Sequence, residues 1–396
     1  MVFRKSPTGY GNQTKLFLPE IAKHYDVACS TFYGLEGDRL NWNGIKVFPG
    51  LGGDFGNGYL AKNAVSHFGS PRGGLLLTLM DVWVLDAKEV GEMNAAAWVP
   101  IDHDPAPPRV LEFFHNSGAA PIAMARFGQE MLKDAGFDAF YVPHGVNTEH
   151  YQPYDKAESR EMLGASQDAF LVGMVAANKG TPSRKCFQQA FQAFAAFREK
   201  HEDAILYLHT NMNGDEDLYA MQRSLGIPSK SVFVADQYRV NLHPLPPQIM
   251  GRLYSTFDVL LSPSAGEGFG VPILEAQACG VPAIVSNFSA MKEVCGAGWK
   301  VECTPRWTLQ RSWQVDPSVP AIIDSLEQAY NLSDAEREKV SALAVNHASQ
   351  YEVGKVMEDH FLPTLQAVEE RFEDRKPMKL EPKRPEPDEL RKVAMP

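Results

Sequence analysis

The sequence is poor in cysteine, in long apolar segments and in positive charge, and each shortage argues against a class of protein. Its five cysteines are scattered and contain no C-x-x-C pair, which argues against a disulfide framework and a zinc site. No apolar run approaches the ~18 residues that span a bilayer, and the first residues lack the hydrophobic region of a signal peptide. We therefore predict a cytoplasmic protein without a transmembrane segment.

The charge balance of the chain is acidic. Lysine and arginine together number 38, against 49 for aspartate and glutamate, so the formal net charge is −11. Bare nucleic acid and anionic membranes are bound through basic surfaces, so we expect no strong nucleic-acid binding. The length of 396 residues allows two domains of ordinary size, each with a core of its own.

What the sequence does contain is a glycine-rich turn between two apolar runs, at residues 262–286. The run at 257–261 leads into a turn with three glycines, Pro272 opens a short helix, and Gly280 ends it before the second apolar run. Such a turn directs the amino end of a helix, with free N–H groups and partial positive charge, towards the space above a sheet. Phosphate groups bind well at such a helix end.

Two carboxylates flank this turn, Glu267 in the loop and Glu275 in the helix. A carboxylate and a phosphate are both anions, so carboxylates beside a bound phosphate make sense only if they hold other groups, such as hydroxyls. A nucleotide sugar carries hydroxyl groups on its sugar and on its ribose. The residues alone leave open the alternative that this turn has only a structural role. The order strand, glycine turn, helix and strand also occurs in doubly wound proteins in general.

The stretch resembles the donor-site signature of glycosyltransferases with two facing Rossmann-like domains, in particular the retaining family 4 group. That signature reads P-S, E-G-F-G, P, a second Glu separated from the first by seven residues, and A-x-A-x-G-x-P. Residue type and spacing agree from Pro263 to Pro282. The resemblance implies the GT-B architecture, an α/β fold in which two Rossmann-like domains, parallel sheets flanked by helices, face each other across a cleft.

Strand and helix patterns alternate along the chain, as this architecture requires. We predict five parts: an N-terminal acceptor-side domain at 1–150, a linker at 151–169, a nucleotide-sugar-binding domain at 170–348, a C-terminal helix packed back on the first domain at 349–372, and a disordered tail at 373–396. The tail is rich in proline and in charges of both signs, and it has almost no apolar residues.

The resemblance also implies which residues of the second domain bind the donor. Arg184 and Lys185 match the basic pair that neutralises the donor diphosphate, with Lys179 as an alternative because the usual G-R-L opening is absent. Glu275 would hold the ribose hydroxyls, and Glu267 the sugar hydroxyls. The full set of donor-binding residues is Asn178, Arg184, Lys185, Tyr254, Glu267, Gly268, Phe269, Gly270, Val271 and Glu275.

In the first domain, residues at strand ends are candidates, because ligands of such sheets collect at the carboxyl ends of the strands. Asp81 and Trp83 follow a buried run at 75–80, and a structural role is equally open for Trp83. A small G-x-G turn at residues 6–14, ahead of a helix pattern at 16–25, resembles the family's N-terminal glycine loop, which lies over the donor phosphates. This resemblance assigns to the acceptor side Gly9, Tyr10, Gly11 and Asn12.

The segment Asp102-His103-Asp104 follows another apolar run and has two interpretations. An Asp-x-Asp motif holds a divalent metal on the donor diphosphate in glycosyltransferases with a single Rossmann-like domain. In the two-domain class, metal is generally unnecessary, and a histidine at this strand end faces the reacting sugar. Because the stretch from Glu267 to Glu275 resembles the second class, we predict His103 and Glu267 as catalytic residues, with no metal and no cofactor.

The predicted function is transfer of a sugar from a UDP- or GDP-linked nucleotide-diphosphate sugar to an acceptor, with retention of anomeric configuration. The acceptor stays open among protein, lipid, glycan and modified base, and so does the oligomeric state. Two alternatives remain. One is another GT-B enzyme, such as a sugar-nucleotide epimerase or a phosphorylase, and the other is a sugar-nucleotide-binding module without activity.

Overall fold

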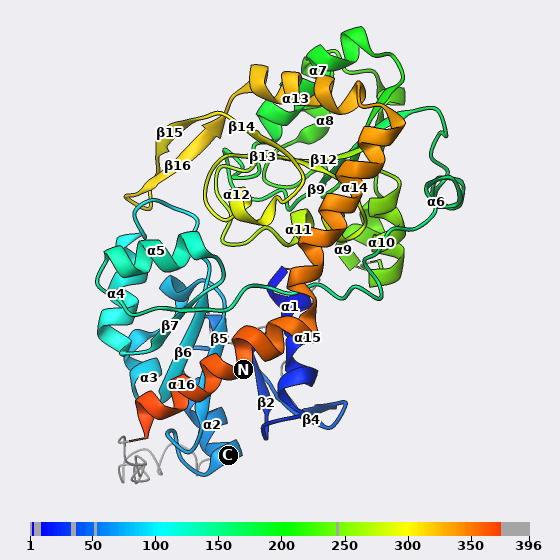
Figure 1. The fold of residues 1–396 in the computed structure, drawn as a ribbon. Helices are drawn as coiled ribbons and strands as arrows, with labels where there is room; N and C mark the ends of the chain where they lie inside the picture. The colour runs from blue at the N-terminus through cyan, green and yellow to red at the C-terminus, as the bar shows by residue number, and fades with distance from the viewer. Residues whose placement is uncertain (1, 4–8, 33–36, 51–53, 243–244, 374–396) are drawn as a thin grey trace, which may run out of the picture.

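The chain forms two α/β domains that lie one above the other and are joined by an extended connection (Figure 1). Each domain is built on its own parallel sheet with helices on the faces, which confirms the predicted fold class. The structure is a computed structural model, and it describes residues 2–3, 9–32, 37–50, 54–242 and 245–373.

The first sheet has the strand order β3-β4-β2-β1-β5-β6-β7-β8, and all neighbours pair in parallel except β3 with β4. The short β1, Val2–Phe3, lies between β2 and β5 in the middle of the sheet. β3, Leu40–Trp42, is an edge strand that the sequence analysis did not predict. The other strands are β2 Ala28–Thr31, β4 Ile45–Phe48, β5 Leu75–Leu79, β6 Asn94–Val99, β7 Ala120–Ala123 and β8 Phe140–Tyr141.

Helix α1, Gly9–Ile21, begins within the segment that the sequence analysis assigned to a glycine turn, so that prediction was wrong for residues 9–14. The earlier part of the predicted turn lies outside the described residues. Phe17 and Leu18 of this helix are buried, and such tertiary packing outweighs the low helix propensity of glycine in the first turn. The other helices of this domain are α2 Leu60–Phe68, α3 Ala87–Gly91, α4 Pro108–Ser117 and α5 Arg126–Asp134.

The second sheet has six parallel strands in the order β11-β10-β9-β12-β13-β14. Helix α7, Phe187–Lys200, packs on it through Phe187, Phe191 and Phe194, which recur on one face and are fully buried. The strands are β9 Phe170–Val175, β10 Ala204–His209, β11 Val232–Val234, β12 Val259–Ser262, β13 Ala283–Ser286 and β14 Gly298–Val301. The other helices are α6 Lys156–Leu163, α8 Leu218–Ser224, α9 Gln237–Leu242, α10 Pro247–Ser255, α11 Val271–Ala278, α12 Met291–Val294, α13 Val319–Tyr330 and α14 Asp334–Ala348.

An antiparallel hairpin that the sequence analysis did not predict extends from the second domain towards the first (Figure 1). Its strands are β15 Cys303–Trp307 and β16 Trp313–Pro317. Trp313 exchanges two backbone hydrogen bonds with Asp104 of the first domain, at 3.0 and 2.9 Å, and the N–H of Val315 donates to the carbonyl of Ala265 at 3.1 Å. β16 therefore links the loop after β6 to the loop after β12.

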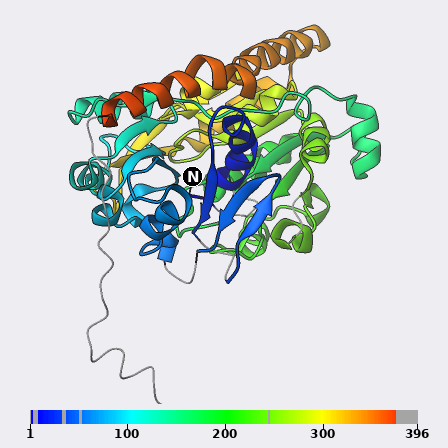
Figure 2. The same cartoon turned by 90° about the horizontal axis from the view of Figure 1, so that it is seen from below.

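After α14 the chain crosses back along the first domain (Figures 1 and 2). The crossing is made by α15 Val353–Val356, a π-helical turn at Met357–Phe361 and α16 Leu362–Phe372. Phe361 stacks on Phe17 of α1 and meets Trp98 of β6 edge-on, with ring centroids 5.2 Å apart in both pairs. From residue 374 on, the predicted disordered tail lies outside the described residues.

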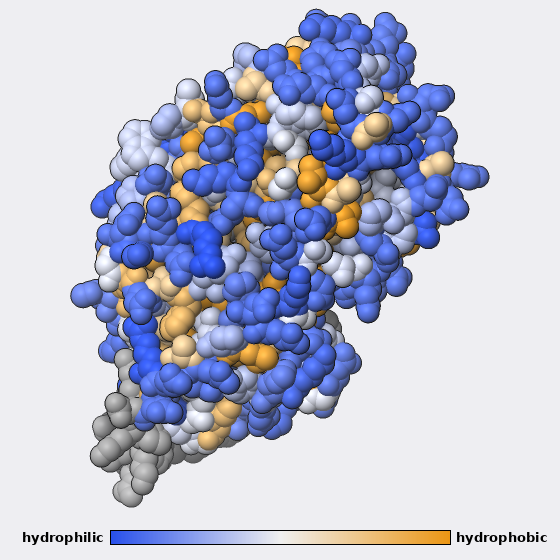
Figure 3. All heavy atoms as spheres, viewed as in Figure 1, coloured by the Kyte–Doolittle hydropathy of each residue, from blue (hydrophilic) through white to orange (hydrophobic). Residues whose placement is uncertain are grey.

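The apolar residues of the described chain are concentrated in the cores of the two domains. Buried apolar clusters cover both sheets. On the face shown in Figure 3, hydrophilic side chains predominate, and apolar side chains occupy smaller areas among them. None of the described helices combines the length and the apolar character that a membrane crossing requires.

Candidate active site

The candidate site lies where the carboxyl ends of the two sheets face each other. The first domain contributes the residues that follow β5 and β6 and the first turn of α1. The second domain contributes the loop after β9 and the loop between β12 and α11, residues 263–270. Hydrogen bonds and ion pairs join side chains of both domains into one cluster. Sheets of this kind bind ligands at this position.

Glu267 lies between two cations ahead of α11. Its Oε2 accepts a hydrogen bond of 2.9 Å from Nη1 of Arg184, and its Oε1 accepts one from Nζ of Lys185. Burial raises the pKa of the Glu267 carboxyl, but the two cations lower that pKa further, to well below its usual range. The predicted basic pair is thus held by the glutamate of the glycine turn, whereas Lys179, the alternative, is exposed.

Glycines of the turn allow the two domains to approach closely. A Cβ atom built on Gly266 would lie 2.3 Å from the carbonyl oxygen of Asp102, and one on Gly268 would lie 2.3 Å from Cβ of Pro100. These two positions need glycine because the backbone of the first domain passes there. Gly270 has a φ of +102°, in the left-handed region that favours glycine, and it immediately precedes α11.

The remaining residues of the turn anchor it and open the helix. Phe269 is buried, and its ring centroid lies 5.2 Å from that of His144 and 5.8 Å from that of Tyr351. Val271 is the first residue of α11, and no side chain caps the amino end of this helix. A bound phosphate would therefore meet the N–H groups of an uncapped first turn.

Glu275 has hydroxyl partners and, among the described residues, no cation in an ion pair with it. The hydroxyl of Tyr254 in α10 donates to its Oε2 at 2.8 Å, and the hydroxyl of Tyr151 acts on the pKa of this carboxyl from nearby. Burial raises the pKa of Glu275 to about 7, and the two hydroxyls offset only part of this rise. Tyr254 is fully buried and holds Glu275, while its predicted contact with the donor stays a prediction.

His103 is buried after β6, and its Nδ1 lies 2.6 Å from Oδ1 of Asp102. Burial raises the pKa of Asp102, but the hydrogen bond with His103 and the charge of Arg184 bring that pKa below its ordinary value. Asp104 is exposed and meets Trp313 through its backbone. No three His, Cys, Asp or Glu side chains are grouped as a metal site requires within the described part of the chain. Independence from metal stays a prediction.

The first turn of α1 reaches the same cluster. The hydroxyl of Tyr10 donates to Oδ2 of Asp81 at 3.2 Å. Burial, with the charges of Asp81 and Asp102, raises the pKa of Tyr10, and the charge of Arg184 opposes this rise. Burial and the nearby Asp102 raise the pKa of Asp81. Trp83 lies in the 3-10 turn after β5 and is 43% exposed. The structure thus brings Tyr10 and Asp81 to the site and leaves Trp83 at the surface.

The loop that carries the basic pair is held by a neighbouring loop of the second domain. The amide of Asn178 donates to the carbonyls of Asn211 and Glu216, at 2.9 and 2.7 Å, and accepts from the N–H of Glu216 at 3.2 Å. Asp215 accepts a hydrogen bond of 2.7 Å from the N–H of Gly180. Because both ends of the Asn178 amide are used, this residue holds the loop in place, and its predicted contact with the donor is untested.

Sequence reasoning missed residues that complete the cluster from distant parts of the chain. The hydroxyl of Tyr151 lowers the pKa of Glu275, and Ser289 Oγ accepts a 2.9 Å hydrogen bond from the N–H of Glu267. Gln314 Nε2 donates to Oδ2 of Asp102 at 3.3 Å. No motif marks these positions in the sequence. Only Asp102 could have been found from the sequence, because it stands beside His103. The sequence analysis considered it only as a possible metal ligand.

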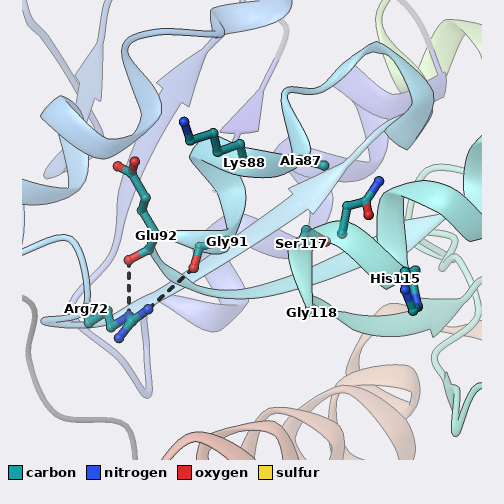
Figure 4. A pocket seen from close by; sticks show the side chains of 9 residues that line it. Arg72, Ala87, Lys88, Gly91, Glu92, His115, Ser117 and Gly118 are labelled. Atoms are coloured by element: carbon teal, nitrogen blue, oxygen red, sulfur yellow. Dashed lines mark hydrogen bonds between the residues drawn. The ribbon is translucent and has the colours of Figure 1, made fainter.

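A separate hollow of about 700 Å³ lies on the first domain (Figure 4). Arg72 is one of its lining residues and donates to the carbonyls of Glu92 and Gly91, at 3.2 and 3.5 Å. Its lining comes from segments that precede β5, β6 and β7. The hollow is therefore at the amino ends of the strands, and none of the predicted site residues lines it.

The likeness to solved structures places the fold in the GT-B class. Sucrose-phosphate synthase from Thermosynechococcus elongatus aligns over 93% of this chain and 95% of its own, with a TM-score of 0.69 and 14% identity. The Anabaena protein HepE, solved in complex with UDP and glucose, aligns over 92% and 99%, with a TM-score of 0.66 and 17% identity. At these identities the likeness establishes the fold alone.

Residues 155–306, from the linker through most of β15, match the family described as glycosyl transferases group 1. D-inositol 3-phosphate glycosyltransferase from Actinosynnema mirum is 30% identical over 154 residues, 37% of this chain and 34% of its own. The lipopolysaccharide core biosynthesis mannosyltransferase LpsB from Rhizobium meliloti is 24% identical over 158 residues, 39% and 42% of the two chains. The matched part of this chain thus spans between a third and a half of the length of these curated relatives.

Proposed function

We propose that the protein transfers a sugar from a nucleotide-diphosphate sugar to an acceptor, with retention of anomeric configuration and without metal. The observation that carries this proposal is the cluster of Arg184, Lys185 and Glu267 at the amino end of α11, opposite Asp102 and His103 of the other domain. The GT-B fold and the family match of the second domain support the same class of enzyme.

The donor diphosphate would lie between Arg184, Lys185 and the amino end of α11. Two cations and free N–H groups would there stabilise the leaving nucleotide, the kind of interaction that supplies much of an enzyme's rate gain. Because Glu267 pairs with both cations in the structure, the diphosphate would replace it. Glu267 would then turn to the sugar hydroxyls, which would donate hydrogen bonds to its carboxylate oxygens.

Glu275 and His103 would hold the two other parts of the donor. Glu275 would accept hydrogen bonds from the ribose hydroxyls, which its ionised form does best. Its pKa of about 7 means that donor binding should strengthen as the pH rises through this value. His103 would face the reacting sugar from the first domain, in keeping with the resemblance of this strand end to the two-domain glycosyltransferases.

Incubation with UDP-, GDP- and ADP-sugars, with nucleotide release as the readout, tests the proposal. Turnover that persists in a metal chelator would support transfer without metal, and NMR of the product would show whether the anomeric configuration is retained. Tight donor binding without release, whichever acceptor is offered, would favour a binding module. A changed sugar on an intact nucleotide would favour an epimerase.

Two variants assign the roles within the site. Glu275→Ala should weaken donor binding, because the ribose hydroxyls lose their acceptor. His103→Ala should leave donor binding intact and lower turnover, because the histidine acts at the reacting sugar. Isothermal titration with the donor and steady-state nucleotide release separate these two effects. Native behaviour of either variant in both measurements would refute the role given to that residue.

A further inference from the structure

The carboxylate of Asp102 connects the histidine of the candidate site to the opposite domain. Its Oδ1 lies 2.6 Å from Nδ1 of His103, which follows it in the first domain. Its Oδ2 accepts a hydrogen bond of 3.3 Å from Nε2 of Gln314 and lies 3.7 Å from Nε of Arg184. Gln314 and Arg184 belong to the second domain, so one carboxylate spans the interface.

The contact with Asp102 fixes which ring nitrogen of His103 carries a proton. An ionised carboxylate only accepts hydrogen bonds, so Nδ1 must be the donor. The neutral ring then presents Nε2 as an acceptor, and this atom has no hydrogen-bond partner among the residues that the structure describes. A hydroxyl group of a bound ligand would find an acceptor there.

Gln314 reaches Asp102 because β16 lies between the two loops of the site. Gln314 is only 5% exposed, and its neighbours in the strand are both held by backbone hydrogen bonds. Trp313 pairs with Asp104 of the first domain, and Val315 pairs with Ala265 of the donor loop. The family match ends at residue 306 and assigns no role to β16. The amide of Gln314 can meet Asp102 only when the hairpin lies on the first domain.

We propose that Asp102 is the positioning residue of His103 and that Gln314 completes this arrangement when the two domains are closed. Asp102 holds the tautomer and the orientation of the imidazole, and Gln314 holds the second oxygen of Asp102. Separation of the domains removes Gln314 and leaves the ring less firmly oriented, so the histidine is set for reaction only in the closed site. This inference rests on the proposed function for the role of His103 opposite the sugar.

Long-range ¹H–¹⁵N spectra of the full chain with ¹⁵N-labelled histidine test the positioning without any substrate. The His103 signals are those that disappear in His103→Gln. In the native protein they should show a proton on Nδ1. Asp102→Asn should redistribute the proton between the ring nitrogens, because the anionic acceptor is gone. Asp104→Asn, the same change on an exposed side chain two residues away, should leave the signals as they are.

Nucleotide release from the donor provides the second readout. Asp102→Asn should lower kcat about 100-fold and leave the donor KM within about threefold, since it misplaces a reacting group without removing a donor contact. Gln314→Leu, which keeps the size and removes the amide, should lower kcat about tenfold. Asp104→Asn should match the native enzyme, because no side-chain contact of Asp104 is involved.

The two readouts separate this inference from the proposed function. Unchanged His103 signals in Asp102→Asn would overturn the positioning role, whatever happens to turnover. An equal kcat in native enzyme, Asp102→Asn and Gln314→Leu would also overturn it. If the native protein releases nucleotide from no donor, the proposed function fails, and the spectra still decide whether Asp102 sets the ring of His103.

Discussion

Glu267 is buried and Glu275 half-buried on one short stretch of chain, and the surroundings of the two carboxylates differ in charge. Glu267, in the loop, pairs with Arg184 and Lys185, and its pKa lies well below the usual range. Glu275, in the helix, has the hydroxyl of Tyr254 as a partner, and its pKa is raised to about 7. Burial raises the pKa of both, so the difference comes from the two cations.

The loop and the helix also differ in what lies against them. The loop faces the other domain, whose backbone leaves no room for a side chain on Gly266 or Gly268. The helix is packed within its own domain, where a Cβ on Gly280 would meet Oγ of Ser341 at 2.4 Å. Charge neutralisation and domain contact thus coincide at the loop, and changes there should affect both stability and closure.

Removal of the charge on Glu267 should give the largest effect. Glu267→Gln leaves Lys185, whose side chain is only 17% exposed, without its counter-ion, and leaves Arg184 with Asp102 alone, at 3.7 Å, among the carboxylates that the structure describes. We expect the free energy of unfolding at neutral pH to fall by about 3 kcal/mol in urea denaturation. Glu275→Gln is the matched control, because no cation depends on it, and should cost much less. An equal fall in the free energy of unfolding in the two variants would contradict the idea that only Glu267 balances buried cations.

The second-largest effect should be a difference between the native protein and Glu275→Gln in how stability depends on pH. Because the pKa of Glu275 rises from 4.5 to about 7 on folding, the folded state holds its proton longer, and stability falls as the pH rises between these values. Glu275→Gln should abolish this fall, which is on the order of 2 kcal/mol between about pH 5 and about pH 8. Urea denaturation of both proteins at the two pH values measures it. The same pH dependence in both would show that Glu275 does not titrate there.

Added methyl groups should distinguish the loop from the helix end. Gly268→Ala places a Cβ against Pro100 of the other domain and should cost roughly 1.5 kcal/mol and increase the radius of gyration in solution scattering. Gly280→Ala is the control, because its clash with Ser341 lies within one domain. It should lower stability without opening the molecule. A native radius of gyration for Gly268→Ala would contradict the close approach of the domains.

Loss of the Tyr254 hydroxyl should give the smallest change. Tyr254→Phe removes one hydrogen bond to Glu275 and should lower the free energy of unfolding by about 1 kcal/mol. It should also raise the pKa of Glu275 further, because this hydrogen bond lowers it. Tyr330→Phe, at a hydroxyl that meets Asp203 at 3.3 Å on the surface, is the control. An equal loss of stability in the two variants would show that the hydrogen bond between Tyr254 and Glu275 contributes no more than the surface contact of Tyr330.

Local patterns in the sequence were sufficient to predict many of the helices and strands. Strand β5, Leu75–Leu79, lies in the apolar run at 75–80, and helix α11, Val271–Ala278, lies where Pro272 and Gly280 predict a helix. The residues that predict each of these elements lie close together in the sequence, so local sequence is enough to predict the element. α1 begins earlier than predicted, and β3 was not predicted, because packing against distant residues stabilises these segments.

The sequence by itself determined the glycine turn with its helix, the two glutamates, the basic pair and the histidine, because each is marked by residue type and short spacing. Tertiary structure alone decided how they are used. It placed the glycines against Pro100 and Asp102, gave Glu267 two cations and Glu275 an uncharged hydroxyl partner, and brought Gln314 to Asp102 across 212 positions of the sequence. Such contacts depend on how two domains and a hairpin pack, and local sequence carries no information about them.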